Sequence, residues 1–214
     1  MLKINQFLPV LILLVSVFSC TSSYQNLKEV SNAQLVSNEL PFPFETNEES
    51  LKYNLGIQTK SNYFSGIFVL KPVAKDTFRL AMTTKSGQKI FDFSLNGETF
   101  EVNHCVPPLQ KKLILSSLEE FFKLIVQPKS LGQSFEVYRL KNEGTPVYRY
   151  KKDGSWYTIF MNQRGMPSAY HKGNSRKPSV VVDFESYEKG NPDSFKLENK
   201  KWVKLEMVFS QLDF

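Results

Sequence analysis

The sequence predicts a mainly β (α+β) fold, in which a curved antiparallel sheet forms a half-closed barrel wrapped around one long amphipathic helix. Three observations predict it. Apolar and polar residues alternate in many short segments, turn residues separate neighbouring segments, and one stretch changes to a helical period. A lone apolar helix face can be buried only against the sheet, which favours this arrangement. A β-sandwich with the helix at one end fits the same pattern.

The chain begins with a segment typical of a bacterial lipoprotein signal peptide, residues 1–19. Lys3 precedes a short apolar run over residues 7–18, too short to span a membrane. Ser19 and Cys20 then resemble the end of a lipobox, although Phe18 is bulkier than usual. We expect Cys20 to be the lipid attachment site, carrying acyl chains such as palmitate. An ordinary secretory signal with a chance cysteine is the alternative.

Residues 20–39 are polar and without a clear period, and are interpreted as the acylated cysteine and a tether. Residues 40–214 are interpreted as a single domain with its own core. No Asp follows Cys20 in Thr21-Ser22-Ser23, which favours the periplasmic face of the outer membrane within the bacterial cell envelope. The membrane is therefore the first expected partner, through the N-terminal acyl anchor.

The expected strands show a period of two. Phe78, Leu80 and Met82 lie on one face of such a strand, and polar residues occupy the other. The segments 91–95 and 203–209 alternate in the same way. Further strands are expected at Tyr53–Thr59, Ser65–Lys71, Glu98–His104, Phe135–Lys141, Val147–Lys151, Trp156–Met161, Ser168–His171, Ser179–Glu185 and Ser194–Leu197.

Turn residues separate these strands. Asn96-Gly97 and Asp153-Gly154 are strong two-residue hairpin signals, and Ser86-Gly87 and Arg164-Gly165 continue the pattern. Such short links predict antiparallel neighbours, because a parallel pair needs a crossover of about a dozen residues or more.

One stretch, residues 108–127, has a helical period. Leu118, Phe121 and Ile125 share one face, which Phe122 widens, and most charges lie opposite. Pro108 is tolerated in a first helical turn, and Pro128 disfavours helix at the preceding residue.

Composition excludes several function classes. After the signal, 26 basic and 21 acidic residues are dispersed along the chain, which does not indicate nucleic acid as a partner. A mildly basic surface suits anionic lipid headgroups, but an ordinary solvated surface is the preferred interpretation. One remaining cysteine and two histidines are too few for a metal cluster. We expect no metal, no cofactor and no catalytic residues.

The remaining candidates for catalysis have simpler structural interpretations. Cys105 beside His104 is expected to be a small buried hydrophobic residue. Asp92 is expected at the surface or in a cross-strand pair. Asp183 and Glu185 share a face and are best explained as cross-strand partners of lysines.

The aromatic content, 14% of the residues, supports two interpretations. Most of these side chains must fill the core. A sharper hypothesis places an apolar ligand groove between the helix and the concave face of the sheet. Its candidate residues are Leu118, Phe121, Phe122, Ile125, Phe78, Leu80, Met82, Trp156 and Phe160, and its rim would include Tyr148, Tyr150, Tyr157, Met161 and Met166.

The first half of the chain resembles the LolB/LolA-like outer-membrane lipoprotein fold family. The resemblance rests on residues 66–71, 78–82, 87–93 and 96–97, and the predicted helix fits the helix packed inside that family's half barrel. It implies the fold and a ligand class, acyl chains or other lipid. The sequence departs from the family in lacking a helical segment before the first strands, and no residue can be assigned to the family's exposed apolar loop.

Three functions remain open at this point. The leading hypothesis is a non-enzymatic, lipid-anchored envelope lipoprotein that binds an acyl chain, a lipid or a lipoprotein between helix and sheet. The alternative is a structural or assembly lipoprotein with a filled core that docks an envelope protein partner. The third is an enzyme built around His104, Cys105 and the Asp183/Glu185 pair.

Overall fold

The computed structural model describes residues 22–30, 43–44, 50–74, 76–126, 135–188, 190–201 and 203–212. The predicted signal peptide and Cys20 lie outside these residues, as does much of the predicted tether. Within the described ranges, no helix is long and apolar enough to cross a membrane.

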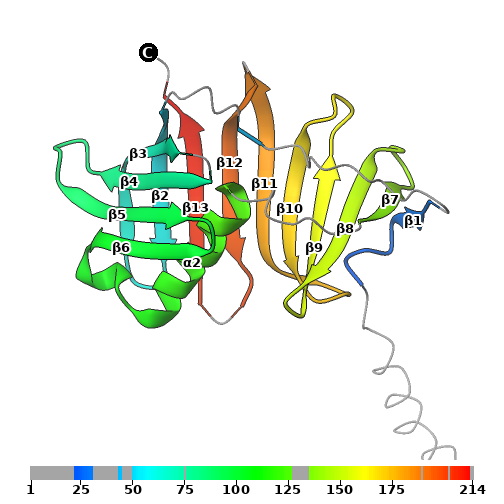
Figure 1. Ribbon diagram of the computed structural model, residues 1–214, viewed down its shortest axis with the longest axis horizontal. Coiled ribbons are helices and arrows are strands. Elements are labelled where there is room, and N and C mark those ends of the chain that lie inside the picture. The colour runs from blue at the N-terminus through cyan, green and yellow to red at the C-terminus, as the bar shows by residue number, and fades with distance from the viewer. Residues whose placement is uncertain are drawn as a thin grey trace, which may run out of the picture.

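The described strands form one antiparallel sheet of 13 strands (Figure 1). Six strands precede the helix: β1 (Leu27–Glu29), β2 (Leu51–Thr59), β3 (Tyr63–Ala74), β4 (Thr77–Thr83), β5 (Lys89–Asn96) and β6 (Thr99–Cys105). Seven follow it: β7 (Glu136–Leu140), β8 (Pro146–Lys152), β9 (Ser155–Met161), β10 (Pro167–Gly173), β11 (Pro178–Glu188), β12 (Asn191–Asn199) and β13 (Leu205–Gln211). Their order in the sheet is β1-β7-β8-β9-β10-β11-β12-β13-β2-β3-β4-β5-β6. The mainly β prediction is confirmed.

The predicted hairpins are present because their turn residues supply the required backbone conformation. Asp153 and Gly154 both have positive φ, 47° and 74°, and join β8 to β9 with Lys152 opposite Ser155. Gly97 has a φ of 53° in the turn that joins β5 to β6. Two positive φ values in a two-residue loop match the right-handed twist of the strands.

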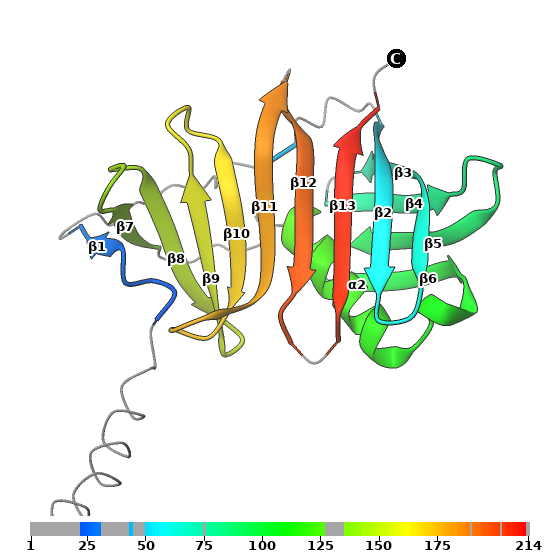
Figure 2. The same ribbon diagram turned by 180° about the vertical axis from the view of Figure 1, so that it is seen from behind.

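The helix α2 (Lys112–Val126) follows a short 3-10 helix, η3 (Pro107–Leu109). The helical prediction is confirmed over Lys112–Val126; residues 108–109 lie in the 3-10 helix, residues 110–111 link the two, and residue 127 lies outside the described residues. Figures 1 and 2 show α2 on one face of the sheet, in front of β13 in one view and behind it in the other. Phe122 stacks against Phe68 of β3, with ring centroids 5.8 Å apart. The core lies between this helix and that face.

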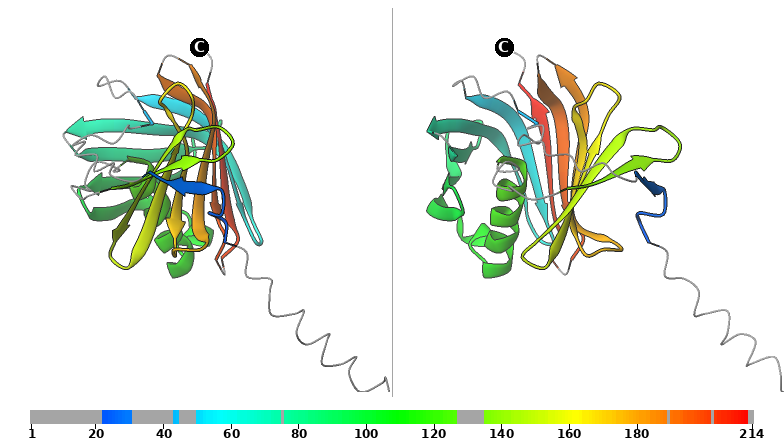
Figure 3. Two further views of the ribbon diagram at one scale, coloured as in Figure 1. Left: turned by 90° about the vertical axis from the view of Figure 1, so that its right-hand side faces the viewer. Right: turned by 45° about the vertical axis from the view of Figure 1, so that its right-hand side comes forward.

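The half-closed barrel is wrong in one respect: the sheet is neither closed nor strongly curled (Figure 3). Its order ends at β1 and β6, which have only one neighbouring strand each among the described residues. Closure would need two complementary edges, but β1 has three residues and most side chains of β6 are exposed. The helix, rather than closure of the sheet, covers the apolar face. Since all 13 strands form one sheet, the β-sandwich is also excluded for this part of the chain.

The N-terminal segment contributes to the sheet. β1 lies inside the stretch interpreted as a tether, and its Leu27 lies opposite Leu140 of β7. The described residues 22–30 therefore run beside the edge of the sheet, although their composition is polar.

A charged cavity between the helix and the sheet

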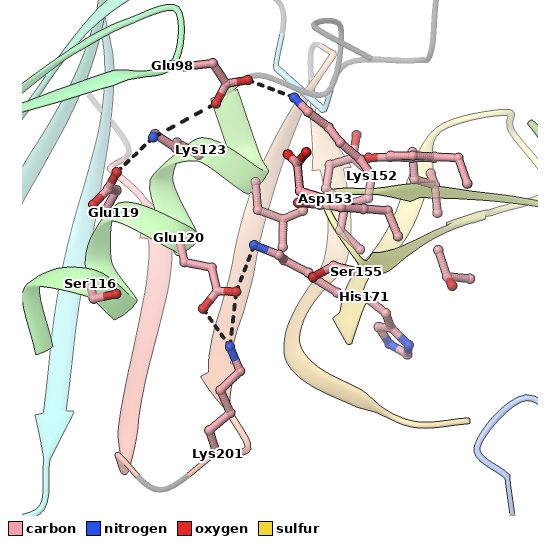
Figure 4. A pocket seen from close by; sticks show the side chains of 17 residues that line it. Glu98, Ser116, Glu119, Glu120, Lys123, Lys152, Asp153, Ser155, His171 and Lys201 are labelled. Atoms are coloured by element: carbon pink, nitrogen blue, oxygen red, sulfur yellow. Dashed lines mark hydrogen bonds and ion pairs between the residues drawn. The ribbon is translucent and has the colours of Figure 1, made fainter. Parts of the chain in front are cut away.

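A cavity of about 440 Å³ lies between α2 and strands β8, β9 and β10 (Figure 4). The turn after β5 and the turn after β12 complete its wall. Four acidic and four basic side chains line it: Glu98, Glu119, Glu120, Asp153, Lys123, Lys152, Lys172 and Lys201. Its place between helix and sheet matches the predicted groove, whereas its lining is largely charged.

Two ion-pair groups cross from the helix to the sheet. Glu120 of α2 binds Lys172 of β10 at 2.9 Å and Lys201 of the β12–β13 turn at 3.2 Å. Burial alone would raise the pKa of Glu120, but hydrogen bonds and charges from the two lysines outweigh it and lower that pKa. In the second group, Glu98 accepts a hydrogen bond from Lys152 at 2.8 Å. Lys123 bridges Glu98 and Glu119 (Figure 4).

The inner wall of the cavity is aromatic and aliphatic. Tyr150 and Tyr157 stack with their ring centroids 4.8 Å apart, and Ile159 and Leu124 lie beside them. Burial raises the pKa of Tyr150, so its hydroxyl stays neutral. A charged rim over an apolar wall is the arrangement that suits an amphipathic ligand.

His171 also lines this cavity, next to the N-terminal segment. Its ring centroid lies 4.7 Å from that of Phe160 and 6.0 Å from that of Tyr24. Burial, with a smaller contribution from Lys200, lowers the pKa of His171 to about 4. Its buried Nδ1 has no hydrogen-bond partner within the described part of the chain.

The nine predicted groove residues occupy other places. Leu118, Phe121, Phe122 and Ile125 of α2 are fully buried in the core, where Phe78, Leu80 and Met82 of β4 also lie. Trp156 packs against the guanidinium of Arg149 at 4.7 Å, and Phe160 packs against His171. None of the nine is among the described residues that line the cavity. Of the predicted rim, Tyr150 and Tyr157 do line it, and ligand binding at either set stays a prediction.

Sequence reasoning missed the charges of the cavity. Glu120, Lys172 and Lys201 belong to three elements far apart along the chain, and no local spacing connects them. The available sequence signal was the pair Glu119 and Glu120 on the predicted helix. Because adjacent helical residues point in different directions, one of the two can reach the sheet while the other stays on the polar face.

The residues weighed for catalysis are held in structural contacts. Asp92 is buried in a cross-strand pair with Arg79, 2.8 Å away, and also binds Lys89. His104 is exposed, and its Nε2 lies 3.2 Å from the carbonyl oxygen of Lys89. Asp183 lies opposite Lys196 in the sheet register, but the ion pairs of that lysine are to Glu198 and Glu206. Glu185 accepts a hydrogen bond from the Ser194 hydroxyl at 2.7 Å, so its cross-strand partner is a serine instead of the predicted lysine. Within the described ranges, no three side chains of the metal-ligating types come together.

Cys105 will resist alkylation in the folded protein. Its side chain is buried, and burial raises the pKa of the thiol to about 11, so little thiolate is present at neutral pH. A chain that starts at Thr21 has Cys105 as its only thiol. Iodoacetamide should leave this chain unmodified under native conditions and label it fully in guanidinium chloride, as read by mass spectrometry. Rapid native labelling would contradict the burial and favour the enzyme hypothesis.

The fold can be compared with solved structures. A LolA superfamily protein from Nitrosomonas europaea superimposes with a TM-score of 0.50 over 82% of this chain and 88% of that chain, at 13% sequence identity. The chain has a LolA-like fold. A DUF1329 family protein from Desulfovibrio piger aligns over 78% of this chain and 85% of that chain, with 8% identity and a TM-score of 0.43. By sequence, no family model and no curated protein matches this chain.

The LolA-like fold confirms the resemblance read from the sequence, at the level of architecture. At 13% identity it establishes the fold alone.

Proposed function

We propose that this chain is a non-enzymatic, lipid-anchored protein of the bacterial envelope that binds an acylated ligand in the cavity between α2 and the sheet. The ligand would be a lipid or the acylated end of a lipoprotein. The observation that carries the proposal is the cavity itself, which combines a charged rim with an apolar wall. Its volume lies within the range of about 300–1,000 Å³ typical of small-ligand sites. The family resemblance of the first half of the sequence implies the same ligand class.

The two sides of the cavity suit the two ends of such a ligand. Acyl methylenes would pack against Tyr150, Ile159 and Leu124, where removal of apolar area from water contributes about 25 cal/mol per Å². The polar headgroup would lie among Lys172, Lys201 and Glu120. Because the lining acids and lysines balance in number, the rim favours a zwitterionic or uncharged headgroup over a strongly anionic one.

The anchor and the location belong to the same proposal. Acylation at Cys20 would hold the domain at the outer membrane, on its periplasmic face, as the signal sequence favours. Mass analysis of the protein extracted from membranes would test the anchor, since acylation adds a defined mass that a Cys20→Ser variant cannot carry.

Native mass spectrometry tests the cavity. Every described element lies between residues 22 and 212, so the chain from Thr21 onward retains them all. This chain, produced in the periplasm and purified without detergent, should carry the added mass of a phospholipid or fatty acid and lose it on unfolding. Ser155→Trp places a large ring at the cavity and should lower the bound fraction at least about tenfold, since the ring occupies the ligand's volume.

The matched control is Ser210→Trp, an exposed serine of β13 that does not line the cavity. It should bind lipid as the parent does, and circular dichroism should show both variants folded. A parent chain without lipid, which also takes up none from added fatty acid or phospholipid vesicles, contradicts the proposal. That outcome would favour the assembly lipoprotein, to be examined by pull-down from membranes.

A further inference from the structure

The turns at one edge of the sheet gather basic residues. The antiparallel registers bring the turns at residues 60–62, 153–154, 174–177 and 200–204 to the same ends of their strands. We call these four turns the basic edge; they follow the lower margin of the sheet in Figures 1 and 2. They contain six basic residues and one acidic residue, whereas the turns at the opposite strand ends, 75–76, 97–98, 141–145, 162–166 and 189–190, contain four and three.

Four of the basic side chains form no ion pair within the part of the chain that the structure describes. Lys60, Arg176, Lys177 and Lys204 are exposed and form no ion pair with any described residue. The other two are engaged inside the domain: Lys200 with Glu198, and Lys201 with Glu120. The four free cations are therefore available to an anionic surface outside the protein.

The N-terminal segment leaves the domain at the same edge. The amide of Ser23 donates to the carbonyl oxygen of Arg176 at 2.9 Å, and the Ser22 hydroxyl donates to that oxygen at 3.1 Å. Tyr24 is 9% exposed, and its ring lies 4.7 Å from the buried guanidinium of Arg149. These contacts fix Ser22 beside the 174–177 turn. In the sequence Cys20 precedes Ser22 by two residues, a length of chain that spans at most about 7 Å.

We propose that the basic edge is the membrane-contacting surface of this protein and binds anionic phospholipid headgroups. An acyl chain on Cys20 would enter the bilayer close to the 174–177 turn, because only two residues of chain separate Cys20 from Ser22. The anchor would thereby hold the side chains of Arg176 and Lys177 at the level of the lipid headgroups. Attraction to an anionic surface contributes about fivefold in affinity for each lysine or arginine near it, and it decays over about 8 Å at physiological salt. An anchor at this edge would keep the basic side chains within that distance of the membrane surface.

This inference rests on the proposed anchoring at Cys20 and adds an orientation to the proposed function. The cavity reaches the same edge, because Asp153 and Lys201 of its lining belong to two of the four turns. With the basic edge against the membrane, the cavity lies next to the bilayer surface from which a lipid would be taken or to which it would be delivered.

Vesicle sedimentation tests the orientation without the anchor. The chain from Thr21 onward is mixed with vesicles of phosphatidylglycerol and phosphatidylcholine, or of phosphatidylcholine alone. We expect binding only to the anionic vesicles. The double variant Arg176→Glu/Lys177→Glu should bind at least about 25-fold more weakly, the product of two fivefold losses.

The matched control is Lys71→Glu/Arg164→Glu, which makes the same change in net charge at two exposed sites near the opposite ends of β3 and β9, away from the basic edge. It should change the binding by no more than about twofold, because those sites lie beyond the screening length from the membrane. Equal losses in both variants would reduce the effect to net charge, and a parent chain that ignores anionic vesicles would overturn the inference. Either result leaves the native mass spectrometry of the cavity unaffected, since that experiment measures bound lipid in solution. Conversely, a cavity found without lipid would not change the outcome of the vesicle sedimentation.

Discussion

Replacing Phe122 with alanine will lower the free energy of unfolding by about 3–5 kcal/mol. Phe122 lies on the buried face of α2 and is 0% exposed. Its ring centroid lies 5.8 Å from that of Phe68, 5.7 Å from that of Phe91 and 6.0 Å from that of Phe93. One side chain therefore joins the helix to β3 and β5. Alanine would leave a cavity among rigid rings, and strands in a continuous sheet cannot move in to fill it.

Guanidinium unfolding followed by circular dichroism measures this loss. Leu113→Ala on the same helix is the control, because Leu113 is 66% exposed and its truncation should cost less than about 0.5 kcal/mol. Similar small losses in both variants would mean that α2 is not held to the sheet by this aromatic cluster. The placement of the cavity beside the helix would then lose its basis.

The same packing constrains any ligand site at the predicted groove. The seven groove residues predicted on α2 and β4 are 8% exposed or less, so a ligand could reach them only by displacing the core. A charge introduced at Phe121 would test folding before it tested binding. For this reason the cavity experiment uses Ser155, which lines the cavity and lies outside the core.

The strands and hairpins could be predicted because their signals are local. Alternation in Phe78–Met82 and the turn at Asp153-Gly154 act within a few residues, and both appear as expected. Openness of the sheet could not be predicted, because it depends on which distant strands pair. β2 lies next to β13, about 150 residues later, and the three-residue β1 lies against β7. Neither pairing leaves a periodic trace in the sequence.

The cavity could be predicted only as a location. A helix that packs one apolar face on a sheet leaves a gap where the helix and the sheet separate, and the cavity between α2 and β8–β10 lies at such a place. Its charges come together through the topology: Lys152 meets Glu98 from 54 residues away, and Lys201 meets Glu120 from 81 residues away. Dispersed charges along the chain thus form ion-pair groups and a basic edge in the folded protein.

The second large effect is a loss of stability in mild acid that depends on His171. Burial holds the folded-state pKa of His171 at about 4, while the unfolded value is near 6.5. Between these two values the unfolded chain binds a proton that the folded protein does not bind. Stability is therefore unaffected by this group above about pH 7, and it falls with decreasing pH by up to about 1.4 kcal/mol per pH unit. The total loss is about 3 kcal/mol by pH 4.

The difference between parent and His171→Gln isolates this contribution from the titrating carboxylates. Urea unfolding at a series of pH values from 7.5 to 4.5 should show the parent losing stability relative to the variant as the pH falls. The control is His104→Gln, which removes the exposed histidine and should keep the acid sensitivity of the parent. If the free energies of unfolding of the parent and of His171→Gln fall equally with pH, then a protonated His171 is accommodated in the folded protein, either exposed to solvent or paired with another group. The ring would then have to leave its contacts with Phe160 and Tyr24, and the N-terminal segment would no longer be fixed where the proposed membrane contact requires it.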